Sequence, residues 1–371
     1  MARMLNPERA LVYRADDHAC NQAIVITLQT GEVIAIFNEE RTLDHADNGY
    51  TSIIRSKDGG RSWDPATRQV IVPPTETEGN WDPAISQLAD GTLMVDFCLT
   101  AFFKRGMDWD GPQYDAGMYS SVKAYLGTYV MRSKDDGYTW DQPTPVNIRP
   151  VKHGGTRVGV MELPDGGLLL PMYGRIQDFH FFGPGETTRA FFVRSDDGGQ
   201  NWEYYSTIAF DPAYINAFSE ASCLRLRDGR IVCIMRSHIM PTKRPDNMYM
   251  AVSDDDGHTF APLKRLNVWG YPTQMINLQD GRVLMTFGYR RGEFGVKALV
   301  SEDGVTWDVS RQFSLHEGGT GPRETERQWW HTGYPCTTQL PDGTLLTVYH
   351  AYSVEERPRQ YVESVRWTLG D

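Results

Sequence analysis

The sequence lacks long apolar runs, an excess of basic charge, and closely spaced pairs of cysteine or histidine. No stretch approaches the roughly 18 uninterrupted apolar residues that a membrane helix needs, so we expect no membrane span. The net charge of -11 disfavours nucleic acid as a partner, because binding to phosphates needs a basic surface. The five cysteines form no CxxC and the nine histidines form no HExxH. We therefore expect reduced thiols, no metal and no cofactor.

The first residues, "MARMLNPERALVYRADD", lack the apolar segment of a secretory signal. This favours a cytoplasmic protein, although a secreted chain already trimmed of its signal would look the same. What the sequence does contain is aromatic side chains, at 12%, which suit a sheet protein or a carbohydrate binder. Nothing in the sequence indicates the oligomeric state.

An internal repeat predicts the architecture. A short apolar run, a turn ending in glycine and a second apolar run occur six times, for example "QLADGTLMVDF" and "QLPDGTLLTVY". Asp-Gly between apolar runs predicts a β-hairpin, and the dipeptide suggests a two-residue type I′ turn. The six turn glycines are Gly31, Gly91, Gly166, Gly229, Gly281 and Gly343.

A second element separates successive hairpins. It reads "SKDGGRSW", "SKDDGYTW", "SDDGGQNW", "SDDDGHTF" and a shortened "SEDGVTW". Ser and Asp side chains can bond the backbone of such a turn, and its glycine accepts positive φ. Each unit therefore has four strands, and six units predict an all-β, six-bladed propeller with four-stranded antiparallel blades. The sixth unit lacks the Asp-rich turn, so we expect its outer strands to come from 359–369 and 9–14.

We expect residues 1–371 to form this single domain, with an aromatic-rich insertion at about 101–126. The five Asp-rich turns match the Asp-box, S-x-D-x-G-x-T-W, and the sequence resembles the sialidase superfamily (BNR repeat) over nearly its whole length. This resemblance implies the propeller fold but not a function, because Asp-boxes also occur in non-catalytic propellers. We expect the box aspartates to be structural.

The innermost strand of each blade begins near the central axis. Counting back nine residues from each turn glycine samples equivalent positions there. Four of the six residues found there could take part in catalysis or bind a charged group, since they are charged or carry a phenol. The six are Gln22, Asp82, Arg157, Glu220, Pro272 and Tyr334.

The resemblance to sialidases assigns roles to several of these residues. It implies that Tyr334 is the nucleophile, that Glu220 is its base, and that Asp44 is the acid, with Asp47 as the alternative. Sialidases depart from most glycosidases in using a tyrosine nucleophile. A phenol avoids repulsion by a carboxylate on the anomeric carbon, but its pKa near 10 requires an adjacent base.

The resemblance also implies the groups that bind substrate. Arg236, seven residues after Gly229, matches a carboxylate-binding arginine. A further arginine precedes the last Asp-box, where Arg290 and Arg291 both remain candidates. Asp82 matches an aspartate that contacts sugar hydroxyls.

One position departs from the family pattern. Asn21 stands where sialidases place the first arginine that binds the substrate carboxylate, ten residues before Gly31. Asparagine carries no charge and cannot form a bidentate bond to a carboxylate. Either Arg41 or Arg157 compensates for it, or the substrate is a different sugar.

These observations predict a glycoside hydrolase resembling an exo-α-sialidase, which removes a terminal acidic sugar with retention of configuration. One alternative is a propeller glycosidase or lyase for a uronic or neutral sugar. The other is a non-catalytic carbohydrate-binding propeller, which the set of Tyr334, Glu220 and Arg236 disfavours.

Overall fold

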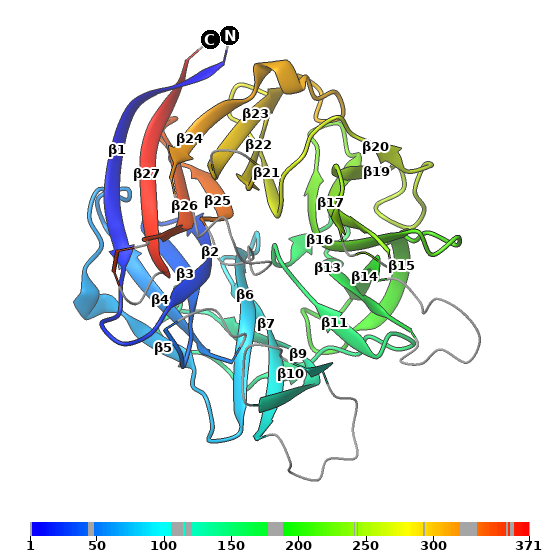
Figure 1. Ribbon diagram of the computed structural model, residues 1–371, viewed down its shortest axis with the longest axis horizontal. Helices are drawn as coiled ribbons and strands as arrows, with labels where there is room; N and C mark the ends of the chain where they lie inside the picture. The colour runs from blue at the N-terminus through cyan, green and yellow to red at the C-terminus, as the bar shows by residue number, and fades with distance from the viewer. Residues whose placement is uncertain are drawn as a thin grey trace.

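The computed structural model describes residues 2–43, 48–104, 114–115, 121–176, 188–240, 242, 244–291, 294–318, 332–353, 355–356 and 360–370, with only the backbone at 102–104, 114–115 and 121–123. Six antiparallel sheets surround a central axis (Figure 1). Within the described residues the helices are two short 3-10 turns, η1 (Pro65–Thr67) and η2 (Val309–Arg311). Neither is long or apolar enough to cross a bilayer. The predicted all-β six-bladed propeller is confirmed.

Each blade has four strands in radial order, and three blades carry one additional short strand. From the axis outward, blade 1 contains β2 (Cys20–Thr27), β3 (Val33–Glu39), β4 (Tyr50–Ser56) and β5 (Gln69–Val72). Blade 2 contains β6 (Glu78–Gln87), β7 (Leu93–Lys104), β9 (Ser121–Ser133) and β10 (Thr144–Pro145), with β8 (Tyr114–Asp115) beside β9. Blade 3 contains β11 (His153–Gly155), β13 (Leu168–Arg175), β14 (Arg189–Ser195) and β15 (Glu203–Ala209), with β12 (Met161–Glu162) beside β13.

The second half of the ring repeats this order. Blade 4 contains β16 (Asn216–Arg225), β17 (Ile231–Ile239), β19 (Tyr249–Ser253) and β20 (Lys264–Arg265), with β18 (Arg244–Pro245) beside β17. Blade 5 contains β21 (Thr273–Asn277), β22 (Val283–Tyr289), β23 (Gly295–Ser301) and β24 (Phe313–Glu317). Blade 6 contains β25 (Gly333–Gln339), β26 (Leu345–Tyr352), β27 (Gln360–Gly370) and β1 (Arg3–Tyr13).

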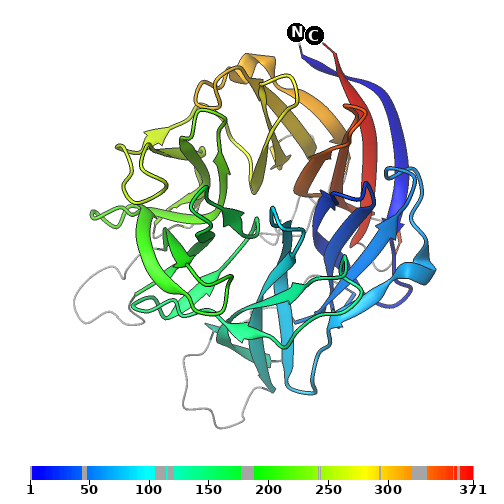
Figure 2. The same ribbon diagram turned by 180° about the vertical axis from the view of Figure 1, so that it is seen from behind.

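Blade 6 closes the ring with strands from both ends of the sequence. β1 pairs antiparallel with β27, from Arg3 opposite Gly370 to Tyr13 opposite Val362. Figures 1 and 2 show the two termini side by side at the outer edge of this blade. The outer strands expected at 359–369 and 9–14 are therefore present, and the N-terminal one, β1, is longer than expected.

The Asp-Gly hairpins are three-residue loops, so the suggested type I′ turn is wrong. In the loop of blade 2, the Gly91 N–H donates to the Leu88 carbonyl (3.0 Å) and the Leu88 N–H donates to the Thr92 carbonyl (2.9 Å). Gly91 alone has positive φ, at 89°, which defines a type I turn followed by a left-handed residue. The Asp90 carboxylate accepts the Thr92 N–H (2.8 Å), and this bond explains the preference for aspartate.

The five Asp-boxes connect the third and fourth strands of blades 1 to 5. In blade 2 the Gly137 N–H donates to the Ser133 hydroxyl (2.8 Å), and Asp135 accepts from both the N–H and the hydroxyl of Thr139 (2.9 and 2.6 Å). These bonds, led by the Thr139 hydroxyl, lower the pKa of Asp135 to about 2. The box aspartates thus accept hydrogen bonds within their own turns. These turns lie at the ends of the third strands, on the face opposite the one where the innermost strands begin.

The insertion expected at about 101–126 begins as a continuation of β7 and ends within β9. Residues 105–113 and 116–120 lie outside the described part of the chain. All five cysteines carry free thiols, and four of them are buried.

Candidate active site

Four inner strands share an unusual backbone at the residue nine positions before the turn glycine. That residue has φ between 47° and 53° in blades 1, 2, 4 and 6, and the pairing of the strand with its neighbour is interrupted there by a bulge. For a residue other than glycine this left-handed conformation costs roughly 1–2 kcal/mol. A bulge redirects a side chain, and such strain gathers at functional sites. The four residues are Gln22, Asp82, Glu220 and Tyr334.

Tyr334, Glu220 and Arg236 form a continuous hydrogen-bonded chain. The Tyr334 hydroxyl donates to Glu220 Oε1 (2.6 Å), and Arg236 Nη1 donates to Glu220 Oε2 (2.8 Å). Glu220 and Arg236 are 4% and 9% exposed. The three residues come from β25 in blade 6 and from β16 and β17 in blade 4, the two blades that flank blade 5.

The protonation states of this chain follow from burial and charge. Burial acts to raise the pKa of the Glu220 carboxyl, but the Arg236 charge and hydrogen bond and the Tyr334 hydrogen bond together hold it below its usual value. Burial, followed by the Glu220 charge, raises the pKa of the Tyr334 phenol well above its usual value. The resting site therefore holds a neutral phenol whose proton points at an ionised carboxylate. This is the arrangement of a nucleophile with its base.

Two further arginines face the same phenol ring. The guanidinium carbons of Arg157 and Arg290 lie 4.8 Å and 5.9 Å from the centroid of the Tyr334 ring. Arg290 also lies 5.2 Å from the centroid of Tyr271, over which Arg236 lies at 4.1 Å. Arg236 and Arg290 thus share one aromatic support next to Tyr334.

The sequence left Arg290 and Arg291 as alternatives, and the structure brings only one of them to the site. Arg291 stacks over Trp269, with its guanidinium carbon 4.2 Å from that ring centroid. Arg290, directly before it, stacks over Tyr271 and faces Tyr334.

Asp82 lies in the same group, on β6. It accepts a hydrogen bond from the Tyr173 hydroxyl (3.3 Å), and its backbone N–H donates to the Gln22 side chain (3.1 Å). It is buried. Neighbouring inner strands therefore support one another through their bulged residues.

Sequence reasoning missed Tyr173 and His350. The His350 ring lies 5.3 Å from the Tyr334 ring, centroid to centroid, and Tyr173 holds Asp82. Both stand seven residues after their turn glycine, the offset that identified Arg236 in blade 4. Applying that offset to all six blades would have found them.

Two other predicted residues are engaged by neighbours outside the chain of Tyr334, Glu220 and Arg236. Asn21 is fully buried and donates to Glu40 Oε1 (3.0 Å) and Gln360 Oε1 (3.2 Å). The Arg41 guanidinium binds the backbone carbonyls of Thr75, Glu76 and Glu78, so it joins two loops and is not presented to Tyr334.

Asp44 and Asp47, the two candidates for the general acid, lie outside the described residues. Their assignment stays a prediction from the sequence.

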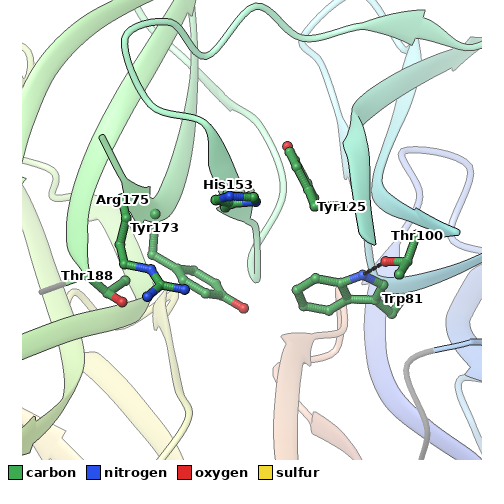
Figure 3. Close-up of a pocket in the computed structure, with 9 residues that line it drawn as sticks. Trp81, Thr100, Tyr125, His153, Tyr173, Arg175 and Thr188 are labelled. Carbon is green, nitrogen blue, oxygen red and sulfur yellow. Dashed lines mark hydrogen bonds between the residues drawn. The ribbon is translucent and has the colours of Figure 1, made fainter. Parts of the chain in front are cut away.

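A cavity of about 220 Å³ is lined in part by Tyr173, whose hydroxyl donates to Asp82, and by Trp81, the residue before Asp82 (Figure 3). Figure 3 shows the rings of Tyr173 and Trp81 on opposite sides of it, with His153 and Tyr125 above them in this view. The Trp81 indole N–H donates to the Thr100 hydroxyl (2.8 Å). Aromatic walls with a few polar groups are typical of a small-molecule site. The lining residues are Trp81, Thr100, Tyr125, His153, Gly154, Tyr173, Gly174, Arg175 and Thr188.

In blade 1, away from this chain, His18, Cys20 and Glu39 place potential metal ligands within 4.8 Å of one another. Both Glu39 oxygens are already engaged, by His18 Nε2 (2.8 Å) and by Arg68 Nε (2.7 Å). The fixed positive charge of Arg68 opposes a second cation there. This group therefore forms a hydrogen-bonded ion network and is a poor metal site.

Comparison with known proteins places these features in a family. Residues 110–348 match the family described as the BNR repeat-like domain. A sialidase from Micromonospora viridifaciens is 24% identical over 332 residues, which cover 81% of this chain and 45% of that protein. The chain thus spans less than half the length of that relative.

Solved structures share the fold. A protein of unknown function from Dyadobacter fermentans superposes with a TM-score of 0.81 at 24% identity, covering 100% of this chain and 99% of that one. The intramolecular trans-sialidase of Ruminococcus gnavus gives 0.68 at 14% identity, covering 96% of both chains. The match to more than half of the sequence, together with the six blades, shows that the chain belongs to the BNR repeat-like family and is a sialidase-like propeller.

Proposed function

We propose that the protein is a retaining exo-glycosidase that removes a terminal acidic sugar from a glycoconjugate. The observation that carries this proposal is the chain from the Tyr334 hydroxyl through Glu220 to Arg236, at 2.6 and 2.8 Å. A non-catalytic propeller has no need to bury a phenol against an ionised carboxylate on a strained backbone.

The chemistry follows from this geometry. The Tyr334 oxygen attacks the anomeric carbon while its proton passes to Glu220, and the bond to the leaving oxygen breaks. A general acid gives that oxygen a proton, and the sequence assigns this role to Asp44. Water then gives a proton to the carboxylate that acted as the acid and attacks the anomeric carbon, the bond from that carbon to the Tyr334 oxygen breaks, and Glu220 returns the proton to Tyr334. Two displacements retain the configuration.

The positive groups around Tyr334 favour an anionic substrate. Arg236 and Arg290 both lie against the Tyr271 ring, so we expect a carboxylate near the anomeric centre to meet two guanidinium groups. Charge-assisted bonds of this kind contribute about 1.5–3 kcal/mol each. The cavity next to Asp82 would take the distal part of the sugar.

A panel of aryl glycosides and sialyl oligosaccharides tests the proposal. We expect turnover of at least one acidic glycoside by the wild-type protein, with retention seen by NMR of the first product. The Tyr334→Phe protein serves as the background. Absence of turnover on every acidic member, or turnover of neutral glycosides alone, would contradict the proposal.

A second candidate is a glycosidase or lyase for a different acidic sugar, such as a uronic acid. The observation that favours it is Asn21, whose neutral amide bonds to Glu40 and Gln360 where sialidases carry an arginine. With that charge missing, we expect sialosides to be poor substrates.

Asn21→Arg is the corresponding prediction. The new guanidinium would lie beside the buried Glu40 carboxylate, and we expect faster turnover of an aryl sialoside than by the wild type. Overpacking should lower the stability by about 1–3 kcal/mol. Asn21→Gln, which adds length without charge, should not improve turnover. A wild type as active on sialosides as a sialidase with all three arginines, assayed side by side, would refute the specificity argument.

A further inference from the structure

Arg157 occupies an exceptional position. It follows β11 in blade 3, where the inner strand is interrupted before β12, and it is 1% exposed. Its guanidinium reaches the centre of the ring and lies against the ring of Tyr334 from the blade opposite. Arg157 is therefore less exposed than Arg236, which is 9% exposed.

Within the part of the chain that the structure describes, the charge of Arg157 is not paired. None of its three guanidinium nitrogens has a hydrogen-bond partner among the described residues. The nearby Asp96 accepts a hydrogen bond from the Thr156 hydroxyl instead, and burial raises the pKa of its carboxyl to about 7. A buried charge without a partner is expensive, by several kcal/mol. A fold keeps such a group when function requires it.

The charges that Arg157 can influence belong to the proposed nucleophile pair. Its positive charge helps to hold the pKa of Glu220 low, and its guanidinium carbon lies 4.8 Å from the Tyr334 ring centroid. A cation is attracted to the face of a phenol ring, and the attraction grows when the ring becomes a phenolate. The same charge therefore favours both the ionised base and the developing phenolate.

We propose that Arg157 is a positioning residue for the nucleophile, whose unpaired buried charge stabilises Tyr334 as it loses its proton to Glu220. This proposal rests on the proposed function. It competes with the alternative in which Arg157 takes the place of the missing arginine and binds the substrate carboxylate, and the kinetics of the variants separate the two roles. Under this proposal the first arginine of the family pattern has no substitute at Arg157.

Arg157→Met tests the proposal because methionine removes the charge and keeps an unbranched side chain. Stability and activity should move in opposite directions. We expect an unchanged or higher melting temperature, kcat reduced about tenfold or more, as one unit of pKa implies, and KM changed less than threefold. Arg157→Lys, which restores a charge, should recover part of kcat.

Arg55→Met is the matched control. Arg55 is also buried, but it is paired, with Glu32 Oε2 at 2.7 Å and with the Asp136 carbonyl at 2.7 Å. Its loss should lower the melting temperature and leave kcat unchanged. A drop in melting temperature for Arg157→Met as large as that for Arg55→Met would show that Arg157 is structural. A rise in KM with kcat unchanged would show that it binds substrate.

A measurement independent of turnover separates this proposal from the proposed function. Fluorinated tyrosine at position 334 lowers the phenol pKa into the range that ¹⁹F NMR can follow. We expect Arg157→Met to raise that pKa by about one unit or more, the usual effect of losing a nearby opposite charge. An unchanged pKa would overturn the inference. Failure of every glycoside in the panel would overturn the proposed function and leave this titration as the deciding test of Arg157.

Discussion

Tyr334→Phe should leave a folded protein with almost no turnover. The substitution removes one hydroxyl and little volume, so packing against His350 and Arg157 should persist. Glu220 Oε1 loses its donor but Oε2 keeps Arg236, so we expect a stability loss of about 1–3 kcal/mol. Loss of a nucleophile should reduce kcat by about three orders of magnitude or more.

Kinetics on the best substrate of the panel, with circular dichroism and urea unfolding, measure both effects. A fluorinated donor that traps the glycosyl intermediate should label the peptide that contains Tyr334, and no peptide of the Tyr334→Phe protein. Glu220→Gln should lower kcat similarly. Tyr349→Phe is a control, because the hydroxyl of this buried tyrosine of β26 is hydrogen-bonded to His316 Nδ1 (3.2 Å) and not to Glu220. Turnover that survives Tyr334→Phe would return Tyr334 to the role of an aromatic wall.

Arg236→Met should have the largest effect on stability. Arg236 and Glu220 form a buried ion pair, with side chains 10% and 6% exposed. Removing one partner of such a pair leaves an uncompensated charge and costs about 3–5 kcal/mol. The double variant with Glu220→Gln removes both charges and should regain much of that loss. Urea unfolding of the four proteins gives the coupling energy directly.

The pH dependence has a definite sign. In the wild type the pKa of Glu220 is lowered, so the pair stabilises the fold above the unfolded carboxyl pKa of about 4.3. This contribution is lost as the pH falls through the folded value. In Arg236→Met, Glu220 should stay protonated to higher pH, and the acid limb of residual kcat/KM should move upward.

Arg265→Met is the matched comparison. Its guanidinium contacts Asp246 Oδ2 at 2.9 Å, but the arginine side chain is 50% exposed. Exposed pairs contribute about 0–1 kcal/mol. If Arg236→Met were no less stable than Arg265→Met, the pair with Glu220 would not be the strong buried interaction that the distances indicate.

Much of the site's placement was available from the sequence because the hairpins repeat in register. Once the turn glycines are aligned, the offset of nine residues identifies Glu220, Tyr334 and Asp82, which the structure brings together around one axis. Tyr173 and His350 follow from the same logic at the second strand. The backbone strain at these positions has no signature in the residue types, so it was not predictable.

Other features depend on partners far away in the sequence. Arg41 could not be assigned because the loop carbonyls that hold its guanidinium belong to residues 75–78. Arg290 and Arg291 are adjacent and identical in type, and only the positions of Tyr271 and Trp269 separate them. The type I′ turn was wrong because Asp-Gly also suits a three-residue loop, in which the aspartate caps the turn.

The closure of the ring by β1 and β27 has a consequence for the reaction centre. The blade that carries Tyr334 is the one in which distant ends of the sequence must find each other, while Glu220 stands in a blade built from one continuous stretch. We therefore expect Tyr334 and Glu220 to meet only after the circle is complete. Fraying at this seam would then separate the two groups without altering either of them, so the pairing of the outermost strand should decide whether their hydrogen bond forms at the axis.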